Sequence, residues 1–407
     1  MEEKRNVPKL RFPGFTDPWE QRRLGDEFDR INERNDGSFG REHWISVSRM
    51  FFQDPEAVQS NNIDTRTYVM REGDIAFEGH PNADFQFGRF VANDIGDGVV
   101  SELFPVYRHK VNYDNSYWKY AIQLERIMGP IFAKAITSSG NSSNKLDSTH
   151  FLKQQILVPR VVEQQAIGAL FQKLDSLIAL HQRELDHVKE LKKGLLQKMF
   201  PKEGTNVPEL RFPGFTDPWE QRRLGEVAHR VTRKNEEGMS DLPLTISAQH
   251  GLVDQRDFFN SQVASRDMRG YYLLERGEFA YNKSTSSDSP WGAIKRLTEY
   301  EKGCLSTLYI CFGLDEGDPD FLVTYYETSR WHRGIRMIAA EGARNHGLLN
   351  IAPGDFFETE LTLPGKIEEQ TAIGALFAKL DSLIALHQRE LDHVKELKKG
   401  LLQQMFV

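Results

Sequence analysis

The chain has 407 residues, of which 39% are hydrophobic and 27% charged, and its formal net charge is −7. This composition is that of a globular protein with roughly two to four domains, and the net charge excludes a uniformly basic nucleic-acid binder but not a local basic groove. The first residues, MEEKRNVPKL, hold no apolar run, and no stretch reaches about 18 apolar residues. We therefore expect no signal peptide, no membrane contact and a cytoplasmic location.

A segment near the start of the chain returns in its second half. NVPKLRFPGFTDPWEQRRLG at residues 6–25 recurs as NVPELRFPGFTDPWEQRRLG at 206–225, and only Lys9 and Glu209 differ. We call this segment the opening repeat. Near-identity over such a length indicates an internal duplication.

The first insert, roughly residues 26–160, has the pattern of a mixed α/β domain. The runs DIAFEG and VVSELFPVY predict strands, and YWKYAIQLERIMGPIFAKAI predicts a helix. Two polar stretches could contact nucleic acid, REGDIAFEGHPNADFQFGRF and SSGNSSNKLDSTH, although acids outnumber bases in the first and the second is equally typical of a flexible loop. The candidate DNA-binding residues here are His80, Asn82, Gln86, Arg89, Ser139, Asn141 and Lys145.

A long amphipathic helix follows the first insert. In ALFQKLDSLIALHQRELDHVKELKKGLLQKMF (169–200), leucines recur at steps of three and four, His181 interrupts the stripe, and Pro201 marks the end. His187 lies six residues after His181 and so on another face of the helix. We therefore interpret His181 as a polar residue that sets the register of a helix seam, and we predict no metal site.

The same helix returns at the end of the chain. Residues 166–200 and 372–406 differ only at two pairs of positions, Gln172/Ala378 and Lys198/Gln404. We call this segment the helical repeat. Some 35 residues at 1.5 Å each form a rod of roughly 50 Å. The simplest arrangement packs the two rods together; antiparallel packing would relate the halves by a pseudo-two-fold axis, and the residues alone leave parallel packing open.

The second insert, roughly 226–365, shares almost no aligned identity with the first. GEFAYN and LSTLYICFGL predict strands, PDFLVTYYETSRWHRGIRMIA predicts a helix, and Cys304 and Cys311 are expected as free buried thiols, with a lone disulfide less well supported. The stretch SRWHRGIRMIAAEGARNH is the clearest basic patch, although a solvated helix face would have the same pattern. The candidate DNA-binding residues are Asn282, Lys283, Ser284, Thr285, Lys295, Arg296, Arg333, Arg344 and Asn345.

The sequence carries no recognisable catalytic motif. It has no GxxxxGK[ST], no GxGxxG after a strand, no HExxH, no zinc-like cysteine pairs and no glycine-flanked serine nucleophile. We therefore predict a binding protein with no catalytic residue.

Four elements that recur in order in both halves resemble the specificity subunit of bacterial type I restriction-modification systems. They are the opening repeat, the GDIAF and GEFAYNKS runs, the EQ…IG…LFxKLD motif and the LIALHQRELDHVKELKKGLLQ helix. The resemblance implies an α+β protein with two α/β target-recognition domains separated by two long helices in an antiparallel coiled coil, a pseudo-two-fold internal repeat. The implied boundaries are 1–160 and 207–365 for the recognition domains, 161–200 and 366–407 for the helices, and 201–206 for the linker.

The resemblance also implies a function. Each domain would read one half of a bipartite, asymmetric double-stranded DNA target across a non-specific spacer. The chain would direct two methylation subunits and restriction subunits to that target, and it would be non-catalytic and hold no cofactor. S-adenosylmethionine, ATP and magnesium would belong to the partner subunits. The alternative is a two-lobed protein–protein scaffold that reads no DNA.

The apolar faces of the helical repeat are candidate docking surfaces for partner helices, although they could equally pack only against the inserts. The residues concerned are Leu170, Phe171, Ile178, Leu180, Leu376, Phe377, Ile384 and Leu386.

Overall fold

The computed structural model consists of two compact units. Unit 1 comprises Met1–Arg183 with Gln388–Val407, and unit 2 comprises Glu184–His387. Each unit therefore combines one insert with parts of both long helices. The structure describes residues 6–58, 63, 66–139, 143–247, 251–259, 265, 267–286, 289–339 and 347–407. Within these residues, the hydropathy of each helix is too low for a transmembrane segment.

Unit 1 is built on a four-stranded antiparallel sheet in the order β2-β9-β6-β7. Its central strand β6, the predicted DIAFEG strand, is buried along its whole length, as expected for a strand covered on both faces. The sheet strands are β2 (Phe28–Ile31), β6 (Ile75–Glu78), β7 (Arg89–Ala92) and β9 (Val106–His109). Paired strands outside it are β1 (Glu20–Arg23) with β12 (Gln155–Val158), β3 (Ile45–Ser46) with β4 (Phe51–Phe52), β5 (Thr67–Met70) with β8 (Gly98–Ser101), and β10 (Ile136–Ser139) with β11 (Asn144–Leu146). The helices are α1 (Leu24–Glu27), η2 (Arg41–His43), α2 (Asn115–Ala121), α3 (Glu125–Ala135), α4 (Ser148–Leu152) and the first part of α5 (Val161–Lys198).

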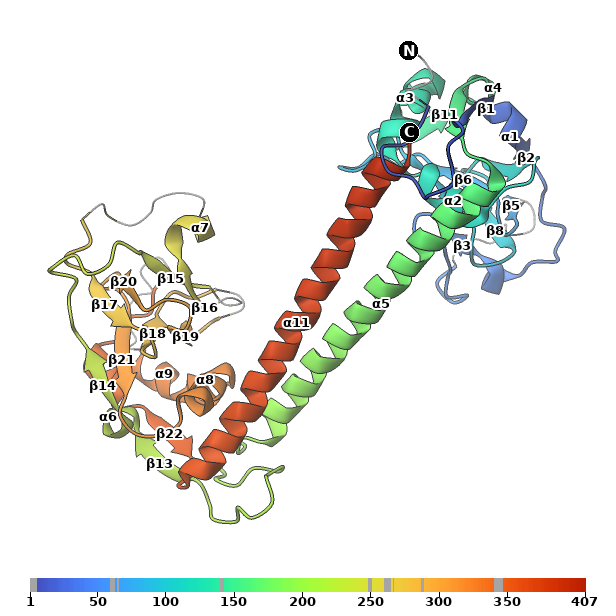
Figure 1. Ribbon diagram of the computed structural model, residues 1–407. Coiled ribbons are helices and arrows are strands. Elements are labelled where there is room, and N and C mark those ends of the chain that lie inside the picture. Colours follow the sequence, from blue (N-terminus) through green and yellow to red (C-terminus); the bar gives the residue numbers. More distant parts are fainter. Residues whose placement is uncertain are drawn as a thin grey trace. The chain divides into compact units, whose positions relative to one another are not determined.

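Unit 2 repeats this topology with a sheet in the order β14-β21-β18-β19 (Figure 1). The sheet strands are β14 (Ala228–Val231), β18 (Phe279–Asn282), β19 (Ala293–Arg296) and β21 (Ile310–Leu314). The other pairs are β13 (Glu220–Arg223) with β22 (Glu360–Leu363), β15 (Leu244–Ser247) with β16 (Gly251–Asp254), and β17 (Tyr272–Glu275) with β20 (Lys302–Leu305). The helices are α6 (Leu224–Val227), α7 (Gln255–Phe259), α8 (Pro319–Glu327), α9 (His332–Ile338), α10 (Pro353–Phe357) and the first part of α11 (Ile367–Met405). Cys304 and Cys311 are buried free thiols, as predicted.

The long helices run antiparallel within each unit, which excludes the parallel arrangement. In unit 1, Asp175 of α5 pairs with Lys398 of α11 at 2.5 Å, and His181, further along α5, approaches Glu390, which comes earlier on α11. In unit 2 the partners are exchanged, because Lys192 of α5 pairs with Asp381 of α11 at 2.5 Å. The interface between the two long helices therefore contains the same Asp–Lys ion pair in each unit.

Each predicted insert helix is broken in two, and both breaks lie at the end of a long helix. The first forms α2 and α3, and the second forms α8 and α9. After the break, the Arg126 guanidinium donates to the carbonyl oxygens of Leu402 and Phe406, each at 3.0 Å, and Arg330 donates to that of Phe200 at 3.5 Å. Carbonyls at a helix C-terminus lack partners in the helix, so both arginines cap a long helix.

The opening repeat closes each unit against the end of a long helix. In unit 1 the Leu10 N–H donates to the Gln404 carbonyl oxygen at 3.0 Å, and Trp19 packs edge-on against Phe406. In unit 2 the Leu210 N–H donates to the Lys198 carbonyl oxygen at 2.9 Å, with a matching tryptophan–phenylalanine contact. Buried bidentate ion pairs fix the same repeat to the start of the other helix, Arg11 with Glu163 and Arg211 with Glu369.

Candidate nucleic-acid interface

In each unit the central strand of the sheet leads into a loop that returns as the edge strand. These are the β6–β7 loop (79–88) and the β18–β19 loop (283–292). Gly88 and Gly292 close the two loops with φ of +91° and +81°, and a Cβ at either position would meet the carbonyl oxygen of Glu78 or Asn282. Glycine is therefore required at the same place in both loops.

A second polar segment lies against each loop. The Asn144 N–H donates to the Gly79 carbonyl oxygen at 2.8 Å, and the Leu349 N–H donates to the Lys283 carbonyl oxygen at 3.0 Å. The segments 143–150 and 347–350 therefore make equivalent contacts with the two loops. Lys145 is exposed on β11, and the structure describes only the backbone of Ser139. Asn141, Arg344 and Asn345, also predicted to bind DNA, lie outside the described residues.

In unit 1 one acid contacts both a histidine and an arginine of the loop. The nearly buried Glu78 carboxylate lies 2.6 Å from Nδ1 of His80 and 3.7 Å from Nε of Arg89. Arg89 also donates to the Ser48 carbonyl oxygen at 2.5 Å and lies over the Phe85 ring. Its charge is therefore partly compensated within the protein.

The other predicted residues of the β6–β7 loop are exposed. The Asn82 side-chain oxygen accepts from the N–H groups of Asp84 and Phe85, at 2.9 and 3.0 Å, so its amide NH2 is the group that faces outward as a donor. Gln86 is exposed near the end of the loop. Both can offer amide groups to base edges.

In unit 2 an amide replaces that acid. The Asn282 side-chain oxygen accepts from the Ser284 N–H at 3.0 Å, and the Thr285 hydroxyl donates to the Gly347 carbonyl oxygen at 3.0 Å. Lys283 lies 3.5 Å from the Ile351 carbonyl oxygen, and partial burial lowers its pKa below the ordinary lysine value. Ser284 is exposed, and Lys295 is half-buried on β19.

The structure does not bring two predicted arginines to this loop. Arg296 stands at the far end of β19, opposite Phe279 at the start of β18, and pairs with Asp320 at 2.6 Å. That ion pair connects the sheet to α8, so Arg296 has a structural role. Arg333 lies on α9, 3.3 Å from Glu203, and lines a cavity of about 910 Å³ that no described residue of the β18–β19 loop lines.

The candidate docking face of the helical repeat is smaller than the sequence predicts. Phe171 and Phe377 are 0% exposed inside the cores of units 1 and 2, so the prediction that they contact a partner is wrong. They bury an apolar face against their own insert. Leu170 and Leu376 pack partly against the same cores, and Ile178 and Ile384 are half-buried. Leu180 and Leu386 remain exposed, at 42% and 41%.

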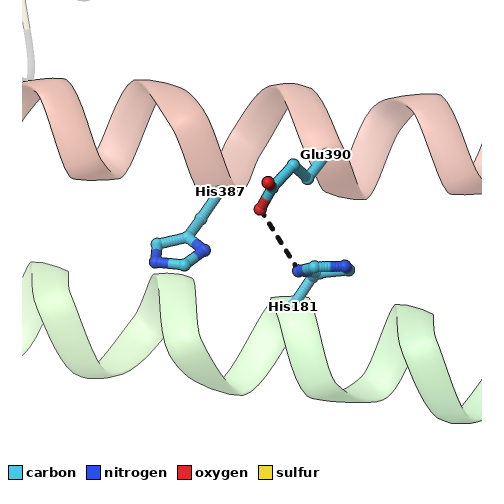
Figure 2. Close-up of side chains that lie close together, drawn as sticks. All are labelled: His181, His387 and Glu390. Carbon is cyan, nitrogen blue, oxygen red and sulfur yellow. Dashed lines mark ion pairs between the residues drawn. The ribbon is translucent and has the colours of Figure 1, made fainter.

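His181 faces the helix seam, as the broken leucine stripe predicts. Its Nδ1 lies 3.5 Å from the Glu390 carboxylate in unit 1, as Figure 2 shows. His387 makes the equivalent approach to Glu184 in unit 2, also at 3.5 Å. Together with the Asp175–Lys398 and Lys192–Asp381 ion pairs, these contacts are polar registration points in the helix seam.

Several equivalent residues of the inserts escape detection from the sequence. Asp114 and Asp318 cap α2 and α8, and each backbone N–H donates to the side chain of a buried glutamine of the helical repeat, Gln164 at 3.0 Å and Gln370 at 2.9 Å. Both glutamines are the second residue of the EQ motif, so that motif was the one feature of the sequence that could have indicated these contacts. Each insert is fixed to its long helix by the same contact.

Comparison with known proteins supports the same fold. No protein-family model and no curated protein matches the chain. The crystal structure of the type I restriction-modification system S subunit from M. genitalium matches 98% of this chain and 99% of that chain, with a TM-score of 0.60 and 13% identity. HsdS from Thermoanaerobacter tengcongensis, at 18% identity, and a chain of a type I restriction-modification assembly, at 16%, match with TM-scores of 0.45 and 0.48. The chain thus has the duplicated α+β fold of a type I specificity subunit, and at the level of the fold the resemblance predicted from the sequence is confirmed.

Proposed function

We propose that the chain is the specificity subunit of a type I restriction-modification system. Each unit reads one half of a bipartite, asymmetric double-stranded DNA target with its sheet-end loop. The observation that carries the proposal is the pair of loops: each is closed by a glycine at the same place and is contacted by a second polar segment, whereas the side chains differ. One frame that presents two unlike sets of polar groups suits two unlike half-sites.

The reading groups we propose are those the structure leaves near each loop. In unit 1 they are His80, Asn82, Gln86, Arg89 and Lys145, and in unit 2 Asn282, Lys283, Ser284, Thr285 and Lys295. Ser139, Asn141, Arg344 and Asn345 belong to the flanking segments and are proposed with them. Because Glu78 places a negative charge beside Arg89, the nearest cation of the unit 1 loop, we expect the isolated chain to bind DNA weakly.

The partners follow from the same proposal. Two copies of a methylation subunit dock on the exposed faces around Leu180 and Leu386, whose matching exposure offers two equivalent surfaces. Restriction subunits join the full complex in the cytoplasm. The chain itself catalyses nothing, and S-adenosylmethionine, ATP and magnesium are bound by its partners. The long helices set the length of the non-specific spacer.

The test is selection of protected sites from a random-sequence duplex library by the full chain with its methylation subunits, followed by footprinting. We expect a split site with two conserved halves, and no protected site at all would contradict the proposal. Retained partner binding without any protected DNA would instead support a protein–protein scaffold.

Matched loop variants sharpen the test. Replacement of Asn82 and Gln86 by alanine should relax one half-site and leave the other unchanged, and replacement of Ser284 and Lys283 should do the reverse. Arg23→Ala, on β1 in unit 1, serves as a control that removes an exposed charge outside both loops. If either loop variant altered both half-sites equally, one loop per half-site would be wrong.

A further inference from the structure

A short turn precedes the strand next to the central strand in both units. Its sequence is SELF at 101–104 and STLY at 306–309. In unit 1 the Leu103 N–H donates to the Ser101 hydroxyl oxygen at 3.4 Å, and the Phe104 N–H donates to the Ser101 carbonyl oxygen at 3.0 Å. In unit 2 Leu308 and Tyr309 make the same two bonds to Ser306, at 3.4 and 3.1 Å. The two turns are therefore one structure made twice.

Each turn presents a leucine to the exterior. Leu103 is 82% exposed and Leu308 is 57% exposed, whereas the following Phe104 and Tyr309 pack onto the cores below. The serine makes both hydrogen bonds through its hydroxyl and its carbonyl, so the turn itself would accept a polar residue in place of the leucine. A single exposed leucine needs no explanation. Two at equivalent positions in inserts that otherwise share little identity indicate a common task.

The turns lie at the sheet end from which the loops emerge. In unit 1 the Phe77 N–H, on β6, donates to the Pro105 carbonyl oxygen at 3.0 Å, directly after the turn. In unit 2 Tyr281 of β18 pairs with Ile310, also directly after the turn. Each turn therefore lies at the same end of the sheet as the proposed reading loop.

A cation stacked on a tyrosine accompanies each turn. Arg34 lies 4.5 Å from the Tyr68 ring centroid and pairs with Glu102 of the turn at 2.9 Å. In unit 2 Lys234 lies 3.8 Å from the Tyr272 ring centroid, and Tyr272 pairs with Leu305, the residue before the turn. An exposed apolar side chain beside a cation is complementary to a DNA duplex, in which stacked bases lie next to phosphates.

We propose that Leu103 and Leu308 are wedges that enter between stacked base pairs of the DNA, one beside each half-site. This inference rests on the proposed function. Because both units carry the same leucine while their loops differ, the wedge acts on DNA shape and not on base identity. Partial unstacking of one step would bend the duplex and bring more of it against each loop.

The experiment uses the full chain with its methylation subunits and duplexes of the selected site, each carrying 2-aminopurine at one position. In the wild type we expect increased fluorescence at one step beside each half-site. Leu103→Ala should abolish the increase beside the first half-site and keep the second, Leu308→Ala should do the opposite, and Leu103→Met should retain both. Met337→Ala, which removes another highly exposed apolar side chain, should change neither.

The outcomes separate the two proposals. If the wild type protects a split site but the fluorescence is unchanged by both alanine variants, the wedges are wrong and the reading function stands. If the alanine variants lose the methylation subunits on gel filtration, the leucines are protein contacts and the wedges are wrong. If the wild type protects no split site, both proposals fall.

Discussion

The β6–β7 and β18–β19 loops are closed by a glycine at the same place but differ in local charge. The first strand ends at Glu78, whose carboxylate contacts His80 and Arg89, and the second ends at the neutral Asn282, whose side-chain oxygen accepts from the Ser284 N–H of its own loop. The positions that close the loop cannot vary without strain, whereas the residue beside it can be an acid or an amide. If the loops read DNA as we propose, fold and recognition depend on different residues of one short segment, and the comparison can be tested at both.

The largest expected effect concerns the shared frame. Phe171→Ala and Phe377→Ala each remove a ring that is 0% exposed, so each should lower the free energy of unfolding of its unit by about 3–5 kcal/mol. Urea denaturation of the full chain measures this. Leu180→Ala, at an exposed position of α5, should cost less than about 1 kcal/mol. Equal, small losses for all three variants would show that the two aromatic positions are not core positions.

A smaller effect is expected at the loop glycines. Gly88→Ala and Gly292→Ala place a Cβ against a carbonyl oxygen at positive φ, and each should cost about 1–3 kcal/mol. Thermal unfolding followed by circular dichroism would measure the loss. Gly194→Ala, in α5 with open space around its Cβ, should instead stabilise the chain by up to about 1 kcal/mol. A stabilised Gly292→Ala variant would contradict the close approach in unit 2.

The acid–amide difference should appear in DNA binding. Glu78→Gln removes a nearly buried negative charge beside Arg89, and it should tighten binding to the selected site by roughly fivefold, since two unit charges about 4 Å apart in water interact by about 1 kcal/mol. Asn282→Asp should weaken it by a similar factor. Fluorescence anisotropy at fixed salt measures both. If both variants shifted the DNA affinity in the same direction, the proposed electrostatic difference between the two loops would be wrong.

The smallest effect concerns the thiols, which occur only in unit 2. Burial raises the pKa of Cys311 to about 12 and also raises that of Cys304, so neither forms an appreciable thiolate at neutral pH in the folded state. Alkylation with iodoacetamide should therefore be slow and should follow the opening of unit 2. Phe377→Ala should accelerate it and Phe171→Ala should not. Acceleration by both variants would mean that the units unfold together.

Much of the frame could be predicted from the sequence, because the repeats are nearly identical and the helical stripe is regular. The antiparallel direction followed from the family resemblance and not from the leucine spacing, which fits either direction; the Asp175–Lys398 and Lys192–Asp381 pairs establish it in the structure. The breaks before Arg126 and Arg330 were missed because apolar periodicity continues through them. The burial of Phe171 was missed because a wide apolar face does not say which neighbour covers it.

The loops were found only in part. GDIAF and GEFAYNKS indicated where each loop starts, and FGRF and WGAI contained the closing glycines without any shared neighbour to mark them. Arg296 was selected for its charge, although the structure commits that charge to Asp320. The SELF and STLY segments can be read in the sequence, but the equivalence of the two turns follows only from their matching hydrogen bonds in the structure.

The closure of unit 1 by Trp19 and Phe406 has a consequence for synthesis. Unit 2 is a single continuous stretch, Glu184–His387, whereas unit 1 needs Gln388–Val407 to complete its core. A growing chain usually folds its domains in the order of their synthesis. Unit 2 can therefore complete its core before unit 1, whose core also needs residues 388–407.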